Sequence, residues 1–90
     1  MRYKMFAIRD SKAEFYNQPF FQHSRLEAER TFLSLARDEK STISKYPEDY
    51  DLYYLGEYDN IHGKLFPLDT PEHIVKAANL PDTRPPSLTM

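Results

Sequence analysis

The chain has 90 residues, of which 40% are hydrophobic and 29% charged, with a formal net charge of −2. This length corresponds to one small domain, and the balance of apolar and charged residues excludes a disordered chain. No apolar run approaches the roughly 18 residues of a membrane-spanning helix. The opening ten residues lack the apolar core of a signal peptide, and the absence of cysteine excludes disulfides and thiolate metal sites.

Charge is divided unevenly along the chain. Residues 1–45 hold nine Lys or Arg and six Asp or Glu, a net charge of +3. Residues 46–90 hold three and eight, a net charge of −5. This excludes a uniformly basic nucleic-acid-binding protein. It leaves two interpretations open, a cationic N-terminal surface or simply two solvated halves.

The opening segment, residues 2–9 (RYKMFAIR), has the pattern of a β-strand. Successive side chains point to opposite faces of a strand, and here both faces carry apolar groups. Such a strand needs cover on two sides, which a chain this short supplies poorly. We therefore expect a homodimer whose contact lies near Tyr3, Met5 and Ala7.

Residues 10–23 are expected to be irregular, because Pro19 removes a backbone donor and disfavours helical geometry before it. Four rings crowd this connection, namely Phe15, Tyr16, Phe20 and Phe21. A loop this aromatic either packs against the fold or binds a ligand. We expect Phe15 and at least one of Phe20 and Phe21 to pack, since an exposed large ring forgoes roughly 1.5–3 kcal/mol of burial.

The clearest predicted helix covers residues 25–38. Ser24 is a suitable N-cap, and Glu27 three residues later completes a capping box. Small and apolar residues recur at helical spacing and predict one buried face. These residues are Ala28, Thr31, Phe32, Leu35 and Ala36.

Turn signals and alternation define the later elements. After a polar connection over 39–49, residues 50–58 and 64–68 are expected to be strands joined by a short turn. A second helix is expected over 71–79, with Thr70 as its cap and a proline at its first position.

The order strand, helix, strand, strand, helix predicts an α+β fold, a small ferredoxin-like β-α-β-β-α unit. A right-handed crossover after the first strand gives a three-stranded sheet of order 1-3-2 with helices on one face. Residues 1–80 form this single domain, and the proline-rich residues 81–90 are expected to be a disordered tail. The expected core residues are Phe6, Ile8, Phe32, Leu35, Leu55 and Phe66.

Catalytic motifs are absent from the sequence. No nucleophile elbow, glycine-rich phosphate loop or P-loop lysine occurs, so we expect neither an enzyme nor a cofactor. His23, His62 and His73 lack the spacing of a helical metal pair. The acidic stretch at 48–59 lacks the spacing of a calcium loop. No metal site is predicted.

Cations and rings do gather near the N-terminus. Rings stack on unpaired bases, while cations follow the phosphate backbone of a single strand. The candidate nucleic-acid-binding residues are therefore Arg2, Lys4, Arg9, Lys12, Tyr16, Phe20 and Phe21. The alternative is that the same rings form the core of a small domain without tryptophan.

Three segments carry a resemblance to a known family: KAE at Lys12–Glu14, PFF at Pro19–Phe21 and PEDYDLYYLG at Pro47–Gly56. With them, residues 1–68 resemble the small nonstructural protein of gokushovirus-type microviruses, which are icosahedral phages with circular single-stranded DNA. The double proline usual before the two phenylalanines is Gln18-Pro19 here.

The resemblance implies a nonstructural accessory protein of single-stranded DNA synthesis or genome packaging. Its expected place is the host bacterial cytoplasm, not the virion or a membrane. It supplies no catalytic or binding residues. We therefore expect weak, sequence-independent binding to single-stranded DNA. The alternative is a protein-interaction module that docks a phage or host replication protein without direct DNA contact.

Overall fold

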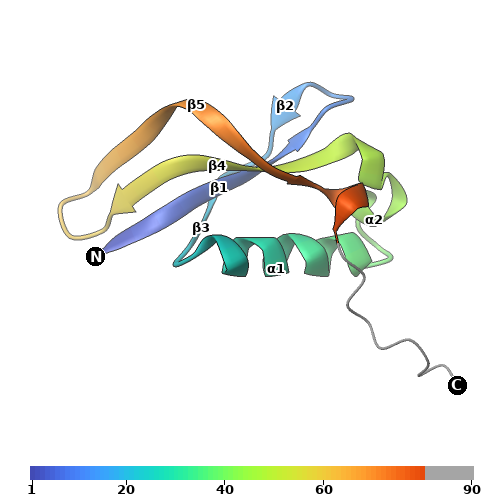
Figure 1. Ribbon diagram of the computed structural model, residues 1–90, viewed down its shortest axis with the longest axis horizontal. Coiled ribbons are helices and arrows are strands. Elements are labelled where there is room, and N and C mark those ends of the chain that lie inside the picture. Colours follow the sequence, from blue (N-terminus) through green and yellow to red (C-terminus); the bar gives the residue numbers. More distant parts are fainter. Residues whose placement is uncertain (81–90) are drawn as a thin grey trace, which may run out of the picture.

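The computed structural model describes residues 1–80, of which 46% lie in strands and 29% in helices (Figure 1). The predicted tail at 81–90 lies outside these residues. The strands are β1 (Arg2–Asp10), β2 (Phe15–Tyr16), β3 (Phe20–Gln22), β4 (Tyr50–Asp59) and β5 (Lys64–Lys76). The α-helices are α1 (Arg25–Arg37) and α2 (Thr42–Lys45), and the 3-10 turns are η1 (Pro47–Asp49) and η2 (Ala77–Asn79). No helix among the described residues is long and apolar enough to cross a membrane.

All strand pairs are antiparallel, and the sheet has the order β2-β1-β4-β5, with β3 also pairing with β1. The predicted ferredoxin-like unit with a three-stranded sheet of order 1-3-2 is therefore wrong. β4 pairs directly with β1, from Arg2 opposite Asp59 to Asp10 opposite Tyr50. The sheet is strongly curled, and α1 lies along one side of it (Figure 1).

The error in topology arises in the aromatic connection. Pro19 divides it into two short strands, and both β2 and β3 turn back against β1. The chain direction is therefore reversed before α1 begins. The crossover through α1 joins β3 to β4, and β1 lies between those two strands. A crossover does exist, but its first strand is β3 and not β1.

The predicted helix over 71–79 is also wrong. β5 continues to Lys76, and only Ala77–Asn79 forms a 3-10 turn. Val75 pairs with Leu52 of β4, so sheet pairing overrides the local capping signal at Thr70. Proline is tolerated here because β5 is an edge strand, and the register with β4 shifts between Tyr54 and Gly56.

The core lies between α1 and one face of the sheet. Phe6, Phe32 and Leu52 are fully buried, and Ile8 is buried beside them. Leu35 packs against this cluster, as predicted, whereas Leu55 is only half-buried and lies outside it. The predicted burial of Phe66 is wrong, because its ring is 39% exposed on β5.

The predicted boundary and buried face of α1 are confirmed. The Ser24 hydroxyl accepts a hydrogen bond from the Glu27 amide at 3.2 Å. The Glu27 carboxylate in turn accepts one from the His23 amide at 3.0 Å. This reciprocal pair satisfies two backbone donors at the start of the helix. Ala28 and Phe32 then point into the core.

Candidate nucleic-acid interface

The second face of the sheet is the candidate site. Phe6 and Ile8 of β1 pack toward α1, so alternation directs Tyr3, Met5 and Ala7 to the opposite face. Within residues 1–80, no α-helix packs on that face (Figure 1). Met5 and Ala7 are nevertheless only 7% and 1% exposed. Something other than a helix must cover them.

Aromatic rings from the flanking strands provide this cover. Phe21 on β3 and Tyr58 on β4 have ring centroids 5.5 Å apart, although β1 lies between their strands. Their contact must therefore pass over β1, where Phe21 pairs with Met5. Tyr16 on β2 and Tyr53 on β4 form a second contact over β1, with centroids 5.3 Å apart and an edge-to-face geometry. Two aromatic bridges thus roof the central strand.

Further rings extend both bridges. His23 lies 4.9 Å from Tyr3, which pairs with Tyr58 in the sheet. At the other bridge, His73 of β5 meets Tyr53 edge-to-face at 5.3 Å. We call the surface formed by Tyr3, Tyr16, Phe21, Tyr53, Tyr58, His23 and His73 the aromatic face. Tyr16 and Phe21 are 42% and 45% exposed, so their rings roof β1 and still present surface to solvent.

Charged groups border the second bridge. The Arg9 guanidinium lies 5.7 Å from the centre of the Tyr16 ring. Asp51, which is 7% exposed, holds the His73 Nε2 atom at 2.8 Å and the Lys76 Nζ atom at 3.3 Å. Lys76 also donates to the Glu48 carbonyl at 2.8 Å. This buried carboxylate fixes a histidine and a lysine beside the rings.

Two of the predicted cations lie on the other face. Arg2 and Lys4 share the side of β1 that carries Phe6, and both approach Glu57, at 2.9 and 3.8 Å. The Arg2 guanidinium also stacks 3.9 Å above the centre of the Phe66 ring. Hydrogen bonding and charge attraction from Arg2, with a smaller effect from Lys4, lower the pKa of Glu57 below its ordinary value. These cations are therefore partly neutralised and point away from the aromatic face.

The other predicted residues are divided among three environments. Arg9, Tyr16 and Phe21 lie together on the aromatic face or at its border. Lys12 is exposed in the turn after β1, and Phe20 packs into the core against Phe6 at 5.9 Å. The expected packing of one of the paired phenylalanines is confirmed by Phe20. The expected packing of Phe15 is wrong, because Phe15 is 51% exposed.

Sequence reasoning missed the contributions of β4 and β5. Tyr53, Tyr58 and His73 all lie on the aromatic face. The strand YDLYYLGEY carries rings on both faces, so alternation alone could not assign them. His73 was placed in a helix that does not form. The available signal was the pair of tyrosines flanking Gly56, which matches a strand with an aromatic side toward solvent.

The remaining acidic residues serve local pairing. Asp59 accepts hydrogen bonds from the His62 side chain at 2.8 Å and from the amides of Ile61 and His62 in the hairpin turn. These contacts, the His62 side chain first, lower the pKa of Asp59 below its ordinary value. In the part of the chain that the structure describes, no three such side chains are grouped to hold a metal ion.

The fold and the aromatic face define a small α+β protein with a curled antiparallel sheet that is open on one side. Comparison with known proteins assigns it to a family. Residues 3–80 match the family described as Phage ORF5 protein. The chain is 32% identical over 68 residues to Protein ORF5 of Chlamydia phage 1, with 71% of each chain covered. It therefore belongs to the phage ORF5 family, which confirms the resemblance to microvirus-type phage proteins. No solved structure matches the chain.

Proposed function

We propose that this phage protein is an accessory factor of single-stranded DNA synthesis or genome packaging that binds a single strand on its aromatic face. The observation that carries the proposal is the pair of aromatic bridges over β1. Tyr16 and Phe21 retain nearly half of their surface for solvent in these bridges. Half-exposed rings on an open sheet are suitable platforms for unstacked bases.

The chemistry of the face favours a single strand without sequence preference. Every base has a π-face, so stacking tolerates any sequence. Arg9 and Lys76 lie at the border of the rings, where cations can contact the phosphate backbone. The acidic second half of the chain opposes close approach from other directions. We expect weak binding that decreases steeply as salt is added.

The proposed role is binding and not catalysis, in the cytoplasm of the host bacterium. Asp51, the charged group best placed to do chemistry on the aromatic face, is already shared between His73 and Lys76. A carboxylate held in this way serves to position its neighbours.

A second candidate function rests on the β4–β5 hairpin. Ile61, Leu65, Phe66 and Leu68 expose 71%, 59%, 39% and 39% of their surface. Exposed apolar side chains gathered on one element are typical of protein-protein contacts. The alternative function is therefore docking of a replication protein through this hairpin, without contact to DNA.

The test measures binding of a fluorescent single-stranded oligonucleotide by anisotropy at two salt concentrations. The chain has seven tyrosines and no tryptophan, so base stacking should also quench its tyrosine fluorescence directly. The variant Tyr16→Leu/Phe21→Leu keeps apolar cover over β1 but removes both exposed rings. Stacking contributes about 1–3 kcal/mol per base, so affinity should decrease at least about fivefold.

The matched control is Tyr46→Leu, because Tyr46 is 58% exposed at the end of α2 and makes no ring contact with the aromatic face. It should bind like the original protein. Thermal melting of each variant separates a loss of binding from a loss of fold. If the original protein binds no DNA at low salt, or the double variant binds unchanged, the hairpin-docking function replaces this proposal.

A further inference from the structure

The outward side of α1 has a pattern that neither the core nor the aromatic face uses. Leu26, Arg30, Leu33 and Arg37 follow one another at intervals of four, three and four residues. This spacing aligns them in one straight stripe along a helix. We call these four residues the outer stripe. Ala28, Phe32 and Leu35 occupy the opposite, buried side of α1.

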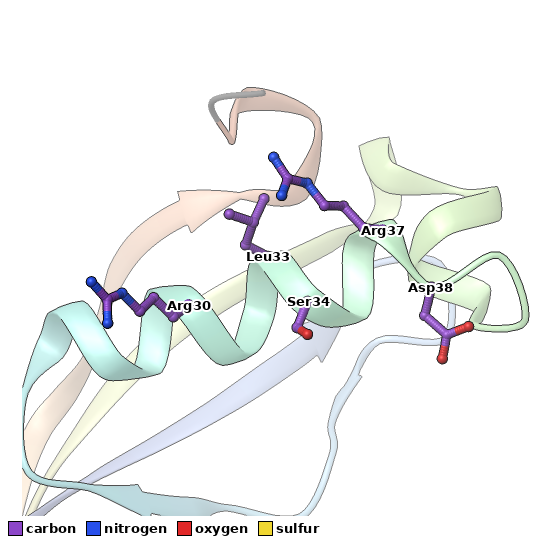
Figure 2. Close-up of a pocket in the computed structure, with 5 residues that line it drawn as sticks. All are labelled: Arg30, Leu33, Ser34, Arg37 and Asp38. Atoms are coloured by element: carbon purple, nitrogen blue, oxygen red, sulfur yellow. The ribbon is translucent and has the colours of Figure 1, made fainter. Parts of the chain in front are cut away.

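The stripe combines exposed apolar surface with positive charge. Leu26 is 60% exposed, and Leu33 is half-buried in the floor of a shallow hollow of about 270 Å³. Arg30, Leu33, Ser34, Arg37 and Asp38 line this hollow. Figure 2 shows Leu33 between the two arginines, with the Asp38 carboxylate pointing away from them. The stripe itself carries no carboxylate.

We propose that the outer stripe docks an acidic, amphipathic helical segment of a partner protein. Helices that lie in such sites place apolar residues at intervals of three and four, which match Leu26 and Leu33. Glutamates or aspartates beside those residues would meet Arg30 and Arg37, for which paired carboxylates are the preferred geometry. Charge complementarity thus selects an acidic partner over a basic one.

Other occupants fit the surface less well. A nucleic acid would leave Leu26 and Leu33 without partners, because none of the residues that line the hollow is aromatic and able to stack on a base. A second copy of the chain would bring four arginines of the two stripes into one interface, with no carboxylate from either stripe to balance them. Only an acidic apolar segment complements both features.

The position of the stripe gives this contact its consequence. α1 packs on the face of the sheet opposite the aromatic face, and the stripe points outward from α1 (Figures 1 and 2). A protein docked there would not overlap a strand held on the aromatic face. The small domain could therefore connect two partners, but docking on the stripe does not depend on DNA binding.

The test uses two synthetic helical peptides, one with leucines flanked by glutamates and one with lysines in place of the glutamates. Binding to the full chain is followed by amide NMR shifts. The acidic peptide should shift the amides of α1 near Leu26 and Leu33, and the basic peptide should not. Arg30→Glu should weaken the acidic peptide about tenfold and improve binding of the basic one. Lys40→Glu, an exposed charge change outside the stripe, should do neither.

Several results would overturn the proposal. One is absence of saturable binding by the acidic peptide, and another is equal binding of both peptides. Shifts confined to the aromatic face would place the peptide elsewhere. A dimer in sedimentation that Leu26→Gln dissociates would show that a second copy covers the stripe. A flatter salt dependence of DNA binding in Arg30→Glu would make the stripe a DNA contact. Arg30 is exposed, so its replacement leaves the fold testable by circular dichroism.

Discussion

Gly56 provides the sharpest test of how the sheet is built. It lies on the central strand β4, between Met5 of β1 and Pro67 of β5, with φ +136°. A Cβ atom at this position would lie 2.7 Å from the Pro67 Cα and 3.0 Å from the Leu68 nitrogen, and would press on the Phe66 carbonyl oxygen. All three atoms belong to the backbone, so no side-chain rotation can relieve the clash.

Gly56→Ala should therefore strain β4 and displace β5 together. A non-glycine residue in such a backbone region costs about 1–3 kcal/mol, and displacement of the paired strand adds to that. We expect a loss of about 3 kcal/mol or more in the free energy of unfolding. For a domain of this size, each kcal/mol lowers Tm by about 4–8 °C, so Tm should decrease by about 12 °C or more.

Gly63→Ala is the matched control, because Gly63 has φ +67° in the hairpin turn and no atom lies within 4 Å of its Cβ position. Only the left-handed backbone is penalised there, by about 1–2 kcal/mol. Urea denaturation followed by circular dichroism measures both variants. Equal losses, or a loss below about 1 kcal/mol for Gly56→Ala, would refute the close approach of β5 to β4 at this point.

Three further substitutions test separate parts of the fold. Phe32→Ala should cost about 3–5 kcal/mol in the free energy of unfolding because the ring is fully buried. Phe66→Ala should cost only about 1 kcal/mol by the same denaturation assay, since Phe66 is 39% exposed. Ser24→Ala should cost about 1 kcal/mol and reduce helical circular dichroism, through loss of the N-cap. Arg2→Ala should raise the pKa of Glu57 toward its ordinary value of 4.5 in an NMR titration. Because the folded-state pKa is lowered, the pair stabilises the fold above about 4.5, and this contribution disappears as the pH decreases through the folded pKa.

Local signals predicted those elements whose cause is local. The α1 helix begins at a capping box and buries one periodic face, and both features are visible in the sequence. The strand character of β1 and β4 was equally visible in their β-branched and aromatic residues. What local signals could not supply was the pairing. Two or three residues of β2 or β3 carry no period of their own, and they become strands only because β1 offers them hydrogen bonds.

The same reason explains the missed end of β5. Thr70, Pro71 and Glu72 form a good helix start by local rules, but His73 and Val75 are held opposite Tyr53 and Leu52 in the sheet. Tertiary pairing outweighs a helix start of a few residues, because isolated short helices are marginal in water.

The expected dimer lost part of its motivation for a comparable reason. We inferred a partner chain because β1 is apolar on both faces. The aromatic bridges of Tyr16–Tyr53 and Phe21–Tyr58 cover Met5 and Ala7 within one chain. Cover by rings from flanking strands depends on strand order, which the sequence left unresolved. Self-association is still a prediction, but β1 no longer requires it.

The division of cations between the two faces changes the expected salt dependence of DNA binding. From the sequence alone, four neutralised phosphates would give a slope of log affinity against log salt of about −3. The structure brings Arg9 and Lys76 to the border of the aromatic face, whereas Arg2 and Lys4 pair with Glu57 on the other face. Two cations predict a slope of about −1.4.

Anisotropy titrations of a single-stranded oligonucleotide over a salt series measure this slope. Arg9→Gln should flatten it by about 0.7, the contribution of one phosphate contact. Arg2→Ala/Lys4→Ala should leave it unchanged, because these side chains project from the α1 side of β1 and already share the Glu57 carboxylate. The reverse result, with a flatter slope in the double variant and none in Arg9→Gln, would place the strand on the α1 side. In that case the aromatic bridges would serve only to roof β1, and the stacking role assigned to Tyr16 and Phe21 would be wrong.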